Sequence, residues 1–147
     1  MTVLKPAAIP VELEDPKRQQ VAADRLIDYM GSLFPDAYAD PQAVLIGLTP
    51  IDVYDGTSSF RYVFGVKGSP SDPKAVVSSS RMDPLFYSEP RNNDLFYTRT
   101  RKLVSKYIGL LYYLLPTSTD PTSPMYDHIG GPSDVDVMTE PLPVARR

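Results

Sequence analysis

Residues 94–115, DLFYTRTRKLVSKYIGLLYYLL, are the longest strongly periodic stretch of the chain. Apolar side chains recur there at three- and four-residue spacing, which places them on one face of a helix. Asn92, Asn93 and Asp94 offer oxygens that can cap the first turn, and Pro116 disfavours helical geometry in the residue before it. We therefore predict a helix over 94–115. Its apolar positions include Phe96, Leu103, Val104, Tyr107, Ile108, Leu110, Leu111, Leu114 and Leu115.

The two halves of this predicted helix differ in character. Arg99, Lys102 and Lys106 lie on one face of the first half, and we interpret them as a solvated face rather than a phosphate site. The second half is apolar nearly all round, which indicates burial on several sides. Gly109 is expected to permit close packing. The tyrosines of the helix are interpreted as core residues whose hydroxyls reach the surface. They are Tyr97, Tyr107, Tyr112 and Tyr113.

The composition narrows the possible classes of function. A chain of 147 residues suggests a single domain over 1–147. There is no cysteine, so disulfides and thiolate zinc sites are excluded. The net charge of −3 argues against a nucleic-acid partner. No apolar run approaches the roughly 20 residues that span a bilayer, so we expect no membrane partner. We expect a cytoplasmic protein without a signal peptide.

The rest of the chain predicts short elements punctuated by prolines. Asp15 and Pro16 resemble a helix start, and the apolar stripe after them predicts a helix that ends within 31–35. Alternating or continuous apolar runs predict buried strands. The fold class is therefore α/β (α+β): a small mixed sheet packed against two long helices. The expected strands are 2–4, 43–48, 51–54, 60–66 and 75–80, the expected loops are 35–42 and 68–73, and 117–147 is expected to be mostly coil.

The order of several segments resembles the archaemetzincin family, zinc-dependent peptidases of the metzincin clan. IGLTPIDVY at 46–54, YVFGVKG at 62–68 and KAVVSSSRMDPLFY at 74–87 precede a long helix with Gly109 inside it. The resemblance runs roughly from 43 to 138. It implies a metzincin-like fold with a cleft in which peptide pairs with an exposed sheet edge. The strand that forms this edge is left open.

The family's zinc motif, HExxHxxGxxH, is lost here. When Gly109 is laid on the glycine between the first two histidines, Lys106 takes the place of the first histidine and Tyr107 that of the general-base glutamate. Lysine repels a dication, and neither leucine nor proline carries a donor atom in its side chain. His128 is the chain's one histidine, so a three-histidine site cannot form. The remaining positions are Leu110 at the second histidine, Tyr113 at the turn glycine and Pro116 at the third histidine.

The resemblance also implies how the fold tolerates this loss. Apolar and aromatic side chains can fill the emptied cleft at ordinary packing density. Tyr113 adopts a positive φ less readily than glycine, so we expect the helix to continue past it and to end only at Pro116. Met125, in SPMYDHIGG, resembles the methionine turn beneath the metzincin zinc site. We expect no metal or cofactor and no catalytic residue.

Three other constellations receive structural interpretations. Asp127 and His128 lack a nucleophile motif that could complete a triad. Asp134 and Asp136 could hold a hard cation together with Asp127, but the pattern of an EF-hand is missing, so we interpret them as solvated turn residues. The triplet Asp55-Gly56-Thr57 is interpreted as a turn.

We carry three hypotheses for the function. The first is a catalytically inactive, zinc-free relative of archaemetzincins that binds a peptide or protein along the former cleft. The second is a peptidase or other hydrolase that uses non-canonical residues in that cleft, with Lys106, Tyr107 and the arginines as its reactive groups. The third is a small accessory domain that acts through oligomerisation; the oligomeric state is left open.

Overall fold

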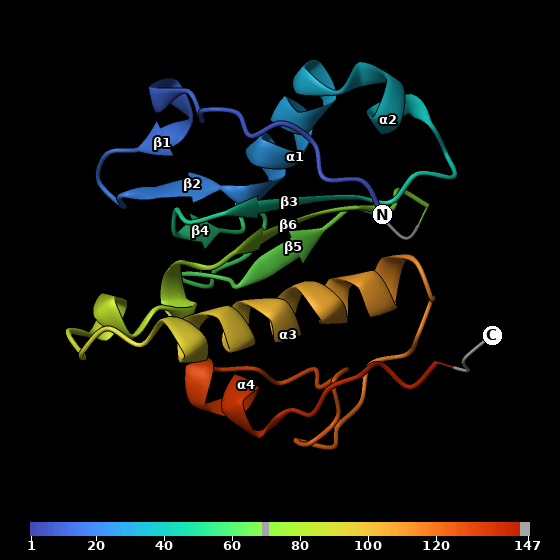
Figure 1. The fold of residues 1–147 in the computed structure, drawn as a ribbon. Helices are drawn as coiled ribbons and strands as arrows, with labels where there is room; N and C mark the ends of the chain where they lie inside the picture. Colours follow the sequence, from blue (N-terminus) through green and yellow to red (C-terminus); the bar gives the residue numbers. More distant parts are fainter. Residues whose placement is uncertain (69–70, 145–147) are drawn as a thin grey trace.

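The structure, a computed structural model, describes residues 1–68 and 71–144 and consists of layers (Figure 1). The helices α1 (Ala23–Leu33) and α2 (Pro35–Ala39) cover one face of the central sheet. The helix α3 (Asn93–Leu111) crosses the opposite face. The short helix α4 (Pro132–Val137) and the C-terminal segment lie on the far side of α3. Three 3-10 helices complete the helical elements of the described residues: Val11–Leu13, Ser80–Met82 and Pro84–Tyr87.

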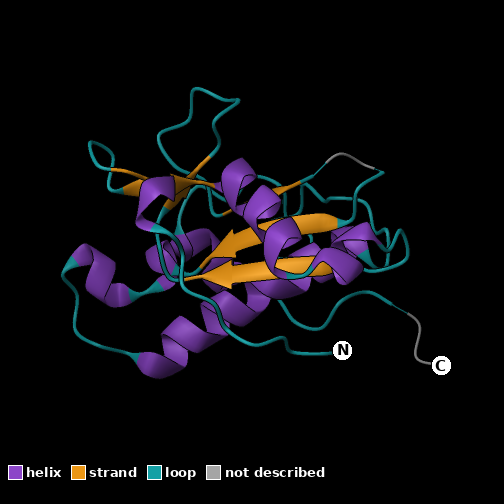
Figure 2. Cartoon of the chain, turned by 90° about the horizontal axis from the view of Figure 1, so that it is seen from above, coloured by secondary structure: helices purple, strands orange, loops and turns teal. Residues whose placement is uncertain are grey.

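The central sheet is mixed and has the strand order β3-β6-β5. β3 (Leu45–Thr49) pairs in parallel with β6 (Lys74–Ser78), and the two strands lie side by side when seen from above (Figure 2). β5 (Gly65–Lys67) pairs antiparallel with β6 and forms an edge of the sheet. A second small sheet has the order β1-β2-β4 and comprises β1 (Glu14–Asp15), β2 (Gln20–Ala22) and β4 (Val53–Tyr54).

The central strand β6 separates two apolar cores. All five of its residues are buried, as expected for a strand covered on both faces. Successive side chains of a strand point to opposite faces, so Val76 packs with Leu26 and Leu45 beneath α1, while Val77 packs with Leu103 of α3. The apolar run predicted as a strand at 75–80 is thereby confirmed, two residues shorter at its end. No described helix is both long enough and apolar enough to cross a bilayer.

The helix α3 begins as predicted and ends earlier. The Asn92 side chain accepts a hydrogen bond of 3.1 Å from the backbone N–H of Leu95, which is the expected cap. The helix stops at Leu111, so its predicted continuation to Pro116 is wrong. Leu114 takes a φ of 53°, and the N–H of Leu115 donates to the carbonyl of Gly109. Contacts of the following segment therefore turn the chain without a glycine.

Several expectations for the N-terminal half are also wrong. The helix predicted to start at Asp15 starts at Ala23, because the residues before it form β1 and β2. Residues 2–4 form no strand, and α2 occupies part of the predicted loop at 35–42. The strand predicted at 60–66 is regular only at Gly65–Lys67. The loop predicted at 68–73 and the coil at 117–147 extend partly outside the described residues, and α4 interrupts the coil.

Arg99 and Lys102, two of the three cations on the basic face of α3, hold α4 in place instead of facing solvent. Arg99 is buried, and its guanidinium donates two hydrogen bonds of 2.8 Å to the Asp136 carboxylate. These hydrogen bonds raise the pKa of Arg99, which therefore stays charged. Lys102 donates to the carbonyls of Val135 and Asp136 at 3.2 and 3.3 Å. A cation at the carboxyl end of a helix is stabilised by the helix dipole.

The expectation that all four tyrosines of the helix are core residues is correct only for Tyr107. Tyr97, Tyr112 and Tyr113 are 59%, 65% and 45% exposed. Tyr112 and Tyr113 follow the end of α3, where they no longer lie on its buried face.

Two glycines let neighbouring segments approach each other closely. A Cβ atom on Gly109 would lie 2.6 Å from the Met125 sulfur, so this glycine permits close packing as predicted. A Cβ atom on Gly65 would lie 2.6 Å from the Tyr107 hydroxyl oxygen and 2.7 Å from Cζ of its ring. Tyr107 therefore packs directly against the backbone of β5.

The substitution Gly65→Ala tests the contact between α3 and β5. The new methyl group meets a rigid aromatic ring, so we expect a loss of about 2 kcal/mol in the free energy of unfolding, measured by urea denaturation. In the Tyr107→Leu background the same substitution should cost clearly less, which gives a positive coupling in a double-mutant cycle. Gly130→Ala is the control, because its nearest heavy atom lies at 3.4 Å. Equal costs of Gly65→Ala in both backgrounds would contradict the packing described here.

The substitution Asp136→Asn tests the attachment of α4. It leaves the buried Arg99 without its charge partner, and since the Asp136 side chain is 36% exposed we expect a cost of about 2 kcal/mol. Glu140→Gln is the matched control, because it breaks the pair of Glu140 with Arg101 on the surface. Thermal denaturation of both variants is the measurement. A stability change for Asp136→Asn no larger than that of the control would show that the pair does not hold α4.

Candidate functional site

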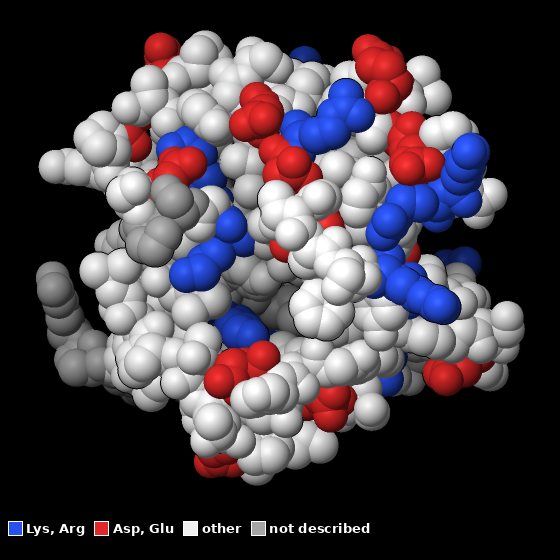
Figure 3. Space-filling view, turned by 180° about the vertical axis from the view of Figure 1, so that it is seen from behind, with Lys and Arg blue, Asp and Glu red and all other residues white. Residues whose placement is uncertain are grey.

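A cleft of about 610 Å³ lies between two chain segments above α3. The segment 60–65 leads into β5 and forms one wall, and the residues 127–130 contribute the other. Figure 3 shows the face opposite to that of Figure 1, which is hollowed near its centre, with both basic and acidic side chains around the hollow. The cleft lining comprises Phe60, Arg61, Tyr62, Val63, Phe64, Gly65, Leu103, Lys106, Tyr107, Asp127, Ile129 and Gly130.

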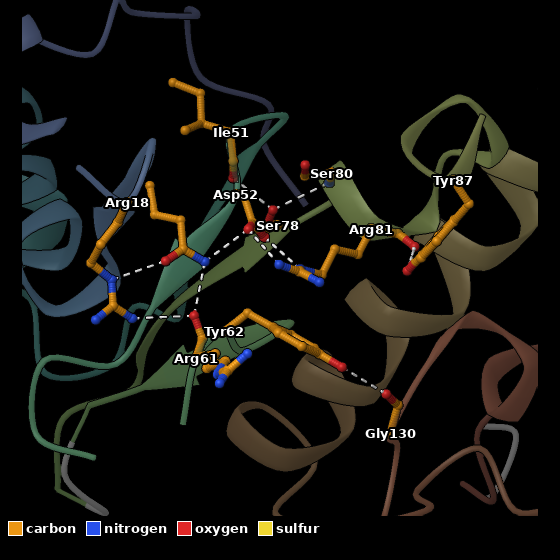
Figure 4. Close-up of polar contacts among 11 residues, drawn as sticks. Arg18, Ile51, Asp52, Arg61, Tyr62, Ser78, Ser80, Arg81, Tyr87 and Gly130 are labelled. Atoms are coloured by element: carbon orange, nitrogen blue, oxygen red, sulfur yellow. Dashed lines mark hydrogen bonds and ion pairs between the residues drawn. The ribbon is translucent and has the colours of Figure 1, made fainter. Parts of the chain in front are cut away.

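A polar network fixes the wall at 60–65 (Figure 4). Arg81 donates hydrogen bonds of 2.9 and 2.8 Å to the two carboxylate oxygens of Asp52. Both side chains are largely buried, with 19% and 13% exposed. Gln20 donates to Asp52 at 2.8 Å and to the backbone carbonyl of Arg61 at 3.0 Å. Arg18 donates to the same carbonyl at 3.2 Å. The network therefore joins β2, the loop before β4 and the cleft wall.

The side chain of Tyr62 connects this polar network to the opposite wall of the cleft. The Arg81 guanidinium stacks on the Tyr62 ring, with 3.5 Å from its central carbon to the ring centroid. The Tyr62 hydroxyl donates a hydrogen bond of 3.1 Å to the carbonyl of Gly130, and Figure 4 shows the side chain reaching from one wall to the other. The two walls are thus directly bonded at this point.

Lys106 lies on the α3 side of the cleft and is half-buried. Burial lowers the pKa of its ammonium group below the ordinary value for lysine, and the nearby charge of Asp127 partly opposes this shift. Within the described part of the chain, Lys106 forms no ion pair or hydrogen bond. Lys106 therefore lies in an open cleft with both aromatic and charged walls. The expectation that apolar and aromatic side chains fill this cleft is wrong, because a cavity of about 610 Å³ remains beside Lys106 and Tyr107.

The other positions that the resemblance aligns with the zinc motif lie in different places. Tyr107 lines the same cleft, and burial raises the pKa of its phenol, which stays protonated. Tyr113 lines a separate depression of about 320 Å³ beside Leu142, while Leu110 and Pro116 line neither cavity. Met125 is buried against Gly109, one turn of α3 beyond Lys106.

The residues at these positions do not fit a zinc ion. Zinc sites use imidazole, thiolate or carboxylate donors, and the lysine ammonium, the phenol, the leucine and the proline supply none of them. No group of three or more such donors that could hold a metal occurs among the described residues. We therefore derive no metal-assisted step for this cleft.

The remaining candidate residues have local structural partners. Asp127 contacts Nδ1 of His128, and no nucleophile joins the pair in the described residues. Asp134 accepts hydrogen bonds from the N–H groups of Gly130 and Gly131 at the start of α4. Asp136 pairs with Arg99 instead of facing solvent. The Asp55 carboxylate accepts from the backbone and hydroxyl of Thr57, as a turn residue does.

Our reading of the sequence missed Asp52, Arg81 and Tyr62. Asp52 and Arg81 occur in the segments IGLTPIDVY and KAVVSSSRMDPLFY that carry the family resemblance, but they are 29 residues apart in the sequence. Their pairing depends on the parallel register of β3 and β6, which brings the ends of both strands together. The sequence did offer one signal for this pair: Asp52 and Arg81 carry opposite charges, and each follows a segment predicted as a strand.

Comparison with known proteins gives a partial sequence match. No protein-family model matches the chain. An archaemetzincin of Thermococcus kodakarensis is 38% identical over 69 residues, which cover 47% of this chain and 36% of that protein. The match thus spans only about a third of this relative's length.

Solved structures match the fold over nearly all of the chain. A zinc-dependent peptidase from Methanocorpusculum labreanum has a TM-score of 0.72 at 23% identity and covers 95% of this chain and 78% of its own. An archaemetzincin from Methanopyrus kandleri has a TM-score of 0.67 at 22% identity, with 90% and 65% covered. One from Archaeoglobus fulgidus, complexed with malonate, has a TM-score of 0.66 at 18% identity, with 92% and 72% covered.

These findings confirm the predicted α/β fold class and the resemblance read from the sequence. The chain has the archaemetzincin fold, and the sequence of nearly half of this chain is homologous to part of an archaemetzincin.

Proposed function

We propose that this chain is a catalytically inactive, zinc-free relative of archaemetzincins that binds an extended peptide along the free edge of β5. The observation that carries the proposal is the outer edge of β5, which pairs with no other named strand of the described residues and borders the cleft at Gly65. The backbone groups of Phe64 and Gly68 form hydrogen bonds to residues of β6. The strand register places Val66, between them, among the residues whose backbone also points toward β6. In an antiparallel ladder the residues between them, Gly65 and Lys67, present their N–H and C=O groups to the free side.

An added strand can use these groups without any metal. Main-chain hydrogen bonds supply affinity in this mode, and pockets for alternate side chains supply specificity. Phe60, Tyr62 and Phe64 offer aromatic surface for such side chains next to the edge. The resemblance aligns no histidine or glutamate of this chain with the zinc motif of the helix, and this supports a role in binding over one in hydrolysis.

The hydrolase hypothesis gains less support from the site. A nucleophile or general base needs a partner within hydrogen-bonding reach that orients it or takes its proton. Lys106 and Tyr107 have no such partner within residues 1–68 and 71–144. Oligomerisation and the cytoplasmic location stay predictions.

The substitution Lys67→Pro tests binding at the β5 edge. Proline removes an N–H that points away from β6, so the sheet should keep its own hydrogen bonds while a bound peptide loses one. We expect retention of N-acetylated random hexapeptides on the immobilised protein to fall about fivefold, which corresponds to roughly 1 kcal/mol. Mass spectrometry of the eluted peptides measures the retention, in buffer with and without EDTA.

Lys67→Thr is the matched control, since it removes the charge and keeps the N–H. It should retain peptides like the parent protein. Retention that needs added zinc, or that is the same for Lys67→Pro and the parent, would overturn the proposed mode of binding.

A further inference from the structure

Two hydrogen-bond donors that have no partner among the described residues line the same cleft. The Lys106 ammonium forms no ion pair or hydrogen bond in the described part of the chain, and the same holds for the Tyr107 hydroxyl. Both side chains line the cavity of about 610 Å³. A partly desolvated ammonium is stabilised by an acceptor of opposite charge. The two donors therefore indicate an anionic ligand group.

The charges that face this part of the cleft agree with an anionic ligand. Arg61 comes from the wall at 60–65, Lys106 from α3 and Asp127 from the opposite wall. Two cations against one carboxylate leave an excess of one positive charge on the lining. The Asp127 carboxylate also contacts Nδ1 of His128, so Lys106 is not its only neighbour.

The direction of an added strand decides which part of a peptide reaches these donors. Tyr107 touches β5 at Gly65, the first residue of this strand, and Gly65 lines the same cavity as Lys106 and Tyr107. A peptide that pairs antiparallel with β5 enters at Lys67 and brings its C-terminal end to Gly65. A parallel peptide would bring its ammonium terminus toward Lys106, and like charges repel each other.

Beyond Gly65, the side chain of Tyr62 crosses the cleft. The hydrogen bond of 3.1 Å from Tyr62 to Gly130 joins the two walls, and the stacked Arg81 guanidinium holds the Tyr62 ring in place. A chain that runs along β5 toward Tyr62 meets this bond, so the geometry suits a chain end better than a continuing chain.

We propose that the cleft captures the C-terminal carboxylate of an extended peptide paired antiparallel to β5, with the Lys106 ammonium and the Tyr107 hydroxyl as its donors. This assignment rests on the proposed peptide-binding function and adds the part of the peptide that is recognised. Capture of a terminal carboxylate by positioned donors is a recurring mode of peptide recognition. Tyr107 remains a donor because burial keeps its phenol protonated.

The test compares three N-acetylated random hexapeptide libraries on the immobilised full chain. The first has free C-termini, the second has C-terminal amides, and the third has amides with a glutamate at every second position. We expect the free-acid library to be retained at least tenfold more than either amide library, because a charge-assisted hydrogen bond to a partly buried lysine is lost in the amides. Lys106→Met should reduce free-acid retention to the level of the amides.

Controls keep the Lys106→Met result interpretable. The substitution removes a charge that burial disfavours, so the variant should unfold at the same urea concentration as the parent or at a higher one. The surface substitution Lys17→Met, in the turn between β1 and β2, should leave free-acid retention unchanged. Retention by the parent should also fall as the pH rises through the lowered pKa of Lys106, since the neutral amine no longer attracts a carboxylate, and amide retention should stay constant.

Each outcome separates the two proposals. If free acids and amides are retained equally, and Lys67→Pro still reduces retention, carboxylate capture is overturned. Binding at the β5 edge then remains supported. Selective retention of the glutamate amides through Lys106 shows a side-chain carboxylate and contradicts recognition of the C-terminus. Retention of none of the libraries overturns the peptide-binding function itself.

Discussion

The cleft depends on the paired hydrogen bonds between Arg81 and Asp52. Neither residue lines the cleft, yet Arg81 stacks on Tyr62 and Asp52 joins Gln20 to the same wall. A pair this deeply buried forms only with good geometry, and the loss of one partner typically costs about 3–5 kcal/mol. The pair therefore holds an irregular stretch, which β5 pairing alone cannot order, in one position opposite the residues 127–130. A peptide-binding groove needs such rigidity, because ordering a loose wall on binding would reduce affinity.

The catalytic cleft of a zinc peptidase can lose its metal without collapsing when other contacts carry the fold. In this chain the resemblance aligns Tyr107 with the general-base glutamate; the Tyr107 ring packs against Gly65, and Met125 packs against Gly109. The resemblance aligns Lys106 with the first histidine of the zinc motif, and Lys106 places an ammonium group in the cleft. A single fixed cation cannot polarise a carbonyl as a zinc ion does, but it can attract a carboxylate. This difference is the physical basis of the proposal that the chain recognises a peptide and does not hydrolyse it.

The sequence predicted those elements whose local pattern and tertiary environment agree. The apolar run of β6 is buried on both faces, and α3 begins at the cap that Asn92 supplies. Local patterns failed where distant residues decide the outcome. Arg99 is buried because Asp136 pairs with it from α4, 37 residues later, and helical spacing alone cannot reveal such a partner. Leu114 adopts a left-handed conformation that its residue type disfavours, because the segment after α3 folds back on Gly109. The candidate site was located at Lys106 and Tyr107 from the family motif, whereas the cleft wall and its support required the structure.

Metal analysis tests the central claim most directly. The purified full chain would be incubated with excess zinc, dialysed, and assayed for bound metal by elemental analysis, with a bound peptide mixture present in a parallel sample. We predict far less than one zinc ion per chain and undiminished peptide retention, because the cleft offers an ammonium and a phenol where zinc needs imidazole, thiolate or carboxylate donors. One zinc ion retained per chain, released together with the peptide on chelation, would contradict the account.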